Sequence, residues 1–115
     1  MDLIDSPSNL SLRQLRAFWL VSQEGSMTRA AARMHLTISA LSMLVRTLEE
    51  ELGVRLFERT TRNIKLTEAG RQFLPTVRDV FFALDAGLQT LQESKRRRSE
   101  RLSVVTSHLL AASLV

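Results

Sequence analysis

The chain has 115 residues, 44% of them hydrophobic, which supplies apolar material for one small core. It carries 16 Lys and Arg against 12 Asp and Glu, a net charge of +4, and only Lys65 and Lys95 of the basic residues are lysines. Arginine suits contact with phosphates and base edges, because a guanidinium donates to two acceptors at once. The absence of cysteine excludes disulfides and thiolate metal sites. The sequence contains no run of ~18 apolar residues, so it does not predict a membrane-spanning helix.

The N-terminal residues lack the basic and apolar segments of a signal peptide, so residues 1–10 are expected to be a flexible leader. A first helix is predicted from about Leu12 to Glu24. Ser11 and Gln14 make a capping box at its start, and Gly25 follows its end.

Residues 27–49 are the most informative stretch of the sequence. Ser26 is placed to cap a short helix over 27–34, and after a tight turn Thr37 is placed to cap a second helix that ends at Gly53. This arrangement is typical of a helix-turn-helix that reads DNA. The second helix has an apolar face directed at the core: Leu41, Val45, Leu48 and Leu52. Its opposite face carries Ser39, Ser42, Met43 and Arg46.

Several polar residues near these helices have two interpretations. The outer face of the second helix could contact a DNA groove or could simply be solvated, and the former is favoured for Ser42. Arg29, in the first turn of the shorter helix, could contact phosphate. Arg46 is expected to contact phosphate rather than a base, since the N-terminal part of a recognition helix lies deepest. His35 is expected to tie the two helices by a hydrogen bond in the turn. Glu49–Glu51 is expected to be a solvated, ion-paired helix end.

Two short β-prone runs, 54–59 and 64–66, flank the polar turn 60–63 and predict a hairpin. A hairpin after a helix-turn-helix is a wing. Arg59 and Arg62 are expected at its tip, with Lys65 close by, where they would meet phosphate or a minor groove.

A fourth helix is predicted from the cap Thr67 to about residue 94. Its apolar residues recur at alternating intervals of three and four, which is a heptad seam. A dimer interface is expected along this seam, although it could also be the core of a further domain. The seam residues are Leu74, Val77, Phe81, Leu84, Leu88 and Leu91.

The basic run within residues 95–100 is interpreted as a hinge. Residues 101–106 have strand propensity and open a last segment, 101–115. Because a lone strand has no sheet to join, this segment is expected to be the start of a domain that is truncated here.

The sequence resembles the N-terminal region of the LysR-type transcriptional regulators over about residues 11–94. The residues that carry the resemblance run in order along the chain: 12–18 (LRQLRAF), 25–31 (GSMTRAA), 40–42 (ALS), 48–60 (LEEELGVRLFERT) and 66–70 (LTEAG). Residues 101–106 also resemble the first strand of the family's effector domain.

The resemblance implies a mainly α fold: a winged helix-turn-helix over 11–66 and a long linker helix over 67–94 that pairs antiparallel with a second subunit. It further implies cytoplasmic, nucleoid-associated binding to double-stranded promoter DNA as a homodimer. A small-molecule inducer would bind the effector domain, no cofactor is expected in this chain, and a tetramer of the parent protein is compatible with the family. The base-contacting positions carried over are Thr37, Ile38, Ser39, Ser42 and Met43.

The recognition segment departs from the family's usual pattern, because Ile38, Ser39, Met43 and Leu44 stand where Gln, Pro, Arg and Gln are common. Apolar contact between Ile38 or Met43 and thymine methyls is a substitute for the lost polar readers, with more reliance on DNA shape. The same loss is the best support for the competing hypothesis, a protein-interaction module that binds no DNA. An enzyme is the weakest class, since no acid, base and nucleophile constellation is visible.

Overall fold

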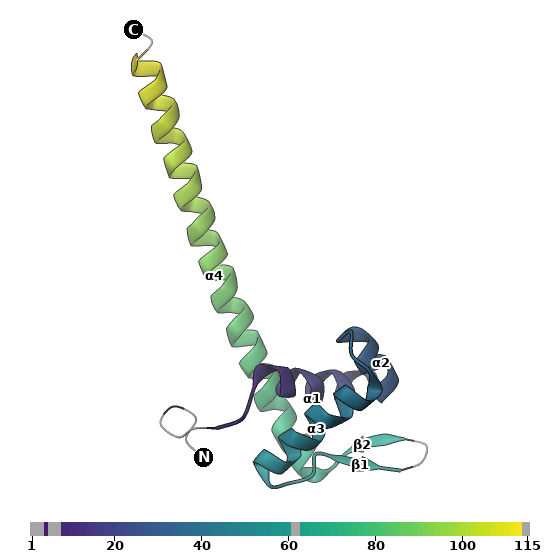
Figure 1. The fold of residues 1–115 in the computed structure, drawn as a ribbon. Coiled ribbons are helices and arrows are strands. Elements are labelled where there is room, and N and C mark those ends of the chain that lie inside the picture. The colour runs from purple at the N-terminus through teal and green to yellow at the C-terminus, as the bar shows by residue number, and fades with distance from the viewer. Residues whose placement is uncertain (1–3, 5–7, 61–62, 114–115) are drawn as a thin grey trace. The chain divides into compact units, whose positions relative to one another are not determined.

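The computed structural model describes residue 4 and residues 8–60 and 63–113 (Figure 1). The chain divides into two compact units, Met1–Arg78 and Asp79–Val115. The elements in chain order are α1 (Leu12–Glu24), α2 (Met27–Arg33), α3 (Ile38–Leu52), β1 (Phe57–Arg59), β2 (Ile64–Leu66) and α4 (Glu68–Ser113). The predicted mainly α fold, with a helix-turn-helix, a two-stranded wing and a long last helix, is confirmed.

The core of the first unit is built around Phe18 of α1, which is completely buried. Its ring lies 5.4 Å from that of Phe57 in β1 and 5.7 Å from that of Phe73 in α4, measured between centroids. The apolar face of α3 completes the core with Leu41, Val45 and Leu48, as the sequence predicted, whereas Leu52 is only half-buried. One small core therefore holds three helices and the wing together.

The helix caps are those that the sequence predicts. Gln14 donates its backbone N–H to the Ser11 hydroxyl at 3.2 Å, and its side chain accepts from the Ser11 backbone N–H at 2.9 Å. Gln14 also donates to the Thr47 hydroxyl at 3.0 Å, so the same side chain joins α1 to α3. Gly25 and Gly53 follow α1 and α3 in the left-handed conformation that glycine adopts most readily.

The last residues of the expected leader contact α3. The Ser8 hydroxyl and the Asn9 backbone N–H both donate to the Glu51 carboxylate, at 3.5 and 3.3 Å. Residues 1–3 and 5–7, the rest of that leader, lie outside the described residues.

The first turn of α4 packs closely on the segment that leads into β1. Thr67 accepts from the Gly70 backbone N–H at 3.0 Å and donates to the Arg55 carbonyl at 2.6 Å. A Cβ at Gly70 would clash with the Leu56 carbonyl oxygen and would lie 2.9 Å from Leu66 Cδ2. Only glycine allows this approach, which fixes where α4 begins.

The predictions of a helix end near residue 94, a hinge over 95–100 and a strand over 101–106 are wrong in this structure. α4 runs unbroken from Glu68 to Ser113. Beyond Gly87 the sequence contains neither glycine nor proline to stop a helix. Arg96 adds ion pairs to Glu93 at 3.1 Å and Glu100 at 4.0 Å. Because the described residues offer residues 101–106 no partner strand, local helix propensity decides their conformation.

None of the described helices combines the length and apolar character that a membrane crossing requires.

Candidate nucleic-acid interface

The first turn of α3 presents an exposed face. Thr37 caps the helix, its hydroxyl accepting from the Ala40 backbone N–H at 3.1 Å. The side chains of Ile38 and Met43 are large, apolar and about half exposed, at 50% and 54%. Ser39 is exposed and Ser42 is half-buried beside them. The structure thus brings the five predicted base-contacting residues together on the N-terminal half of one helix.

The turn before α3 depends on an unusual backbone conformation at His35, which has a φ of 56°. Its backbone N–H donates to the Ala32 carbonyl at 3.2 Å, and the next residue, Leu36, donates to the Ala31 carbonyl at 2.9 Å. This backbone bond closes the end of α2 and does not reach α3, so the described contacts of His35 do not include the expected hydrogen bond between the two helices. Its imidazole is exposed.

The predicted wing is present as an antiparallel pair in which Glu58 lies opposite Lys65, and Arg59 opposite Ile64. Beyond the strands, Thr60 donates through its hydroxyl to the Asn63 carbonyl at 2.8 Å. Lys65 is exposed on β2, whereas Arg62 lies outside the described residues.

Glu49 is ion-paired as expected, but its side chain is buried rather than solvated. Its side chain is buried and accepts from the backbone N–H groups of Leu56 and Phe57, at 2.7 and 3.4 Å. It also forms an ion pair with Arg59 at 3.4 Å. Glu49 stands four residues after the buried Val45, and this helical spacing is the signal that could have placed it inside.

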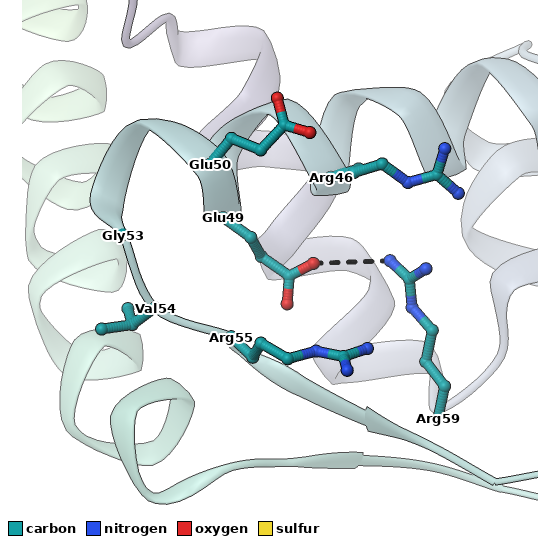
Figure 2. A pocket seen from close by; sticks show the side chains of 7 residues that line it. All are labelled: Arg46, Glu49, Glu50, Gly53, Val54, Arg55 and Arg59. Carbon is teal, nitrogen blue, oxygen red and sulfur yellow. Dashed lines mark hydrogen bonds and ion pairs between the residues drawn. The ribbon is translucent and has the colours of Figure 1, made fainter.

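The ion pair also revises the expected position of Arg59. Its guanidinium folds back to α3 and is about one-third exposed, at 34%, rather than extending freely from a wing tip. Arg46 of α3 and Arg55, which the sequence analysis did not single out, line the same pocket (Figure 2). The cations thus gather between α3 and the wing. Arg29 is exposed on α2.

The predicted seam of α4 divides into a buried part and an exposed part. Val77 is completely buried, so it belongs to the core of the first unit and its assignment to a dimer interface is wrong. Leu74 and Phe81 are half-buried. Leu84, Leu88 and Leu91 become progressively more exposed along the helix, at 40%, 51% and 67%.

A helix-turn-helix with an exposed recognition helix, followed by an arginine-bearing wing, defines the class of winged helix-turn-helix domains. The family model described as "Bacterial regulatory helix-turn-helix protein, lysR family" matches residues 12–71. The chain belongs to the LysR family.

Similar proteins agree with this assignment. The HTH-type transcriptional regulator PgrR of Escherichia coli (strain K12) is 38% identical over 104 residues, which are 90% of this chain and 35% of PgrR. An uncharacterised HTH-type regulator of Azotobacter vinelandii is 39% identical over 99 residues, 86% of this chain and 69% of that protein. The crystal structure of a BenM_DBD/catB site 1 DNA complex is similar with a TM-score of 0.70 and 33% identity, over 73% of this chain and 94% of that one.

Proposed function

We propose that this chain is the DNA-binding part of a transcriptional regulator that recognises promoter DNA as a dimer. The observation that carries the proposal is the exposed N-terminal face of α3, held by the Thr37 cap and flanked by arginines. The similarity to a DNA-binding domain in complex with DNA supports it. The regulators that the chain resembles also favour a role in regulation over one in catalysis.

In this proposal α3 enters the major groove with its N-terminal turn foremost. Thr37, Ser39 and Ser42 would donate to or accept from base edges through their hydroxyls. Ile38 and Met43 would pack against thymine methyls, since their exposed apolar side chains have no other described partner to cover them. A recognition helix with few side chains that can make two hydrogen bonds to one base depends more on the shape of the DNA.

The flanking cations would hold the phosphate backbone or a minor groove on either side of this helix. Such contacts fix the orientation of the protein and carry most of the salt dependence, because each neutralised phosphate releases counterions. The candidates are Arg29, Arg46, Arg59, Arg62 and Lys65.

Dimerisation is proposed through the exposed part of the α4 seam, Leu84, Leu88 and Leu91, together with the half-buried Leu74 and Phe81. A leucine stripe at heptad spacing on a long exposed helix is what a partner helix buries. The two-fold dimer would present two recognition helices to two half-sites of one operator.

The chain spans about a third of the length of PgrR, so the behaviour of a whole regulator goes beyond it. We propose that an effector domain following this chain binds a small-molecule inducer. A cytoplasmic location and a tetrameric parent protein belong to the same proposal.

The proposal is tested by fluorescence anisotropy of the chain on labelled duplexes that cover the intergenic region beside its own gene. A scrambled duplex of equal length is the control, and both are titrated across a salt series. Binding to one duplex that survives at a salt concentration where the control is lost is the expected result. Equal and salt-fragile binding to both duplexes would contradict sequence-specific recognition.

Two further measurements complete this test. Ser42→Ala should weaken binding to the recognised duplex by roughly tenfold relative to the scrambled one, in line with one lost base contact. If the chain is dimeric by light scattering yet binds no duplex at low salt, the function is a protein-interaction module instead.

A further inference from the structure

A surface pocket of ≈ 390 Å³ lies between the C-terminal half of α3 and the segment that leads into β1. Arginines from three separate places in the chain line it: Arg46 from α3, Arg55 from the loop after α3, and Arg59 from β1. Figure 2 shows their guanidinium groups on the same side of the Glu49 carboxylate, with the Glu50 carboxylate pointing away from them. The pocket is therefore lined by three arginines and two carboxylates, of which only Glu49 is directed toward the arginines.

The charges in this pocket are unevenly compensated. Arg59 is paired with Glu49 at 3.4 Å. Arg46 and Arg55 are exposed, and within the described part of the chain neither has an ion pair. The two cations are thus available to an anion from outside, and a guanidinium with free N–H groups binds the oxygens of a phosphate in a bidentate way.

Glu49 gives the pocket a fixed geometry. Its buried carboxylate accepts from the backbone N–H of Leu56, at 2.7 Å, directly after Arg55. The same carboxylate holds Arg59. Glu49 lies about one turn after Arg46 on α3. The Glu49 side chain therefore sets the spacing between this part of α3 and the two arginines of the wing segment, Arg55 and Arg59.

From this geometry we infer that Arg46, Arg55 and Arg59 form one clamp for a single phosphate of the DNA backbone, with Glu49 as its positioning residue. The inference rests on the proposed function and deepens it, because it names Arg55 as a DNA contact and assigns three arginines to one phosphate. A backbone phosphate fits better than a free small anion, since the pocket is a surface hollow between α3, which is proposed to enter the major groove, and the segment that leads into the wing, which is proposed to contact the flanking backbone.

The experiment measures anisotropy of the full chain on the recognised duplex and on the scrambled duplex, for Arg55→Gln across a salt series. We expect affinity for both duplexes to fall by about five- to tenfold near 0.1 M salt, and the slope of log K against log salt to decrease by about one. The matched control is Arg96→Gln, which removes an exposed arginine from α4 and should change neither quantity. Circular dichroism confirms that both variants are folded.

The outcomes separate this inference from the proposed function. If the unmodified chain binds DNA and Arg55→Gln behaves like Arg96→Gln, the clamp is wrong while the proposed function stands. A loss confined to the recognised duplex would also overturn it, because a phosphate contact weakens all sequences alike. If the unmodified chain binds no duplex, the proposed function itself fails.

A double-mutant cycle tests whether the arginines share one phosphate. In Arg46→Gln/Arg55→Gln, the fold-loss of affinity should be clearly smaller than the product of the two single fold-losses. Once one arginine is removed, the shared phosphate is held less firmly, so the remaining arginine contributes less and its removal costs less. Losses that multiply to within about twofold would assign the two residues to separate phosphates and overturn the clamp.

Discussion

The two compact units of the chain differ in how much of their apolar surface they bury. In the first unit, Met1–Arg78, all three short helices and the wing bury apolar side chains around Phe18. In the second unit, Asp79–Val115, Phe81 is half-buried and every other side chain described, up to residue 111, is exposed. Long helices gain most of their stability from tertiary packing of one face. The first unit should therefore fold by itself, whereas the second depends on a partner.

The largest effect that sharpens this contrast is expected at Phe18. Phe18→Ala removes a completely buried ring that contacts the rings of Phe57 and Phe73. It should lower the free energy of unfolding of the first unit by about 3–5 kcal/mol, from lost burial and the cavity left behind. Urea denaturation followed by Trp19 fluorescence measures this change.

Phe82→Ala is the matched control, since Phe82 lies in the second unit and is 62% exposed. It should change the same unfolding free energy by less than about 0.5 kcal/mol. Equal losses from the two substitutions would show that the units are not energetically distinct.

A second test concerns the first turn of α4, which belongs to the first unit. Gly70→Ala places a methyl group against the Leu56 carbonyl and Leu66 Cδ2. The Leu56 carbonyl is a backbone group, so no side-chain rotation relieves this clash, and the better helix propensity of alanine does not offset it. We therefore expect a loss of about 2–3 kcal/mol in unfolding free energy. The measurement is again urea denaturation, and an unchanged midpoint would contradict the close approach.

The helix-turn-helix was predictable because its signals are local. Capping residues, the left-handed glycines and an apolar stripe at helical spacing are visible within a few residues of the elements that they define. Thr37 and Gly53 each mark a boundary of α3 in this way. The exposed side of α3 followed directly, as the complement of its buried stripe.

The features that were missed depend on contacts between distant segments. A buried carboxylate was not expected at Glu49, because its partners are backbone N–H groups of a loop whose course the sequence does not reveal. The Gly70 contact with Leu56 has the same character. For residues 101–106, strand propensity and helix propensity compete, and the outcome is decided by whether a partner strand is present.

The dependence of the second unit on a partner is tested at Leu88, which is 51% exposed in the single chain. Leu88→Ala should weaken dimerisation by about 2 kcal/mol, or roughly thirtyfold, because both copies lose about one kcal/mol of apolar burial. Sedimentation equilibrium measures the dissociation constant. Gln89→Ala, at the neighbouring exposed position, should leave it unchanged. Equal effects of the two substitutions would place the dimer interface elsewhere.

The smallest effect is expected at Gly87, where the same substitution as at Gly70 should have the opposite sign. Nothing lies within 4 Å of a Cβ added at Gly87. Alanine is favoured over glycine in an exposed helix by about 1 kcal/mol, so Gly87→Ala should slow hydrogen exchange of the surrounding α4 amides roughly fivefold, with no change in the unfolding of the first unit. Gly87 stands three residues after Leu84 and four before Leu91, so it lies beside the seam and a partner helix would pass close to it. If Gly87→Ala instead weakens dimerisation, the partner helix packs so closely at this position that it leaves no room for a methyl group. The open space around Gly87 in the single chain is then filled in the dimer.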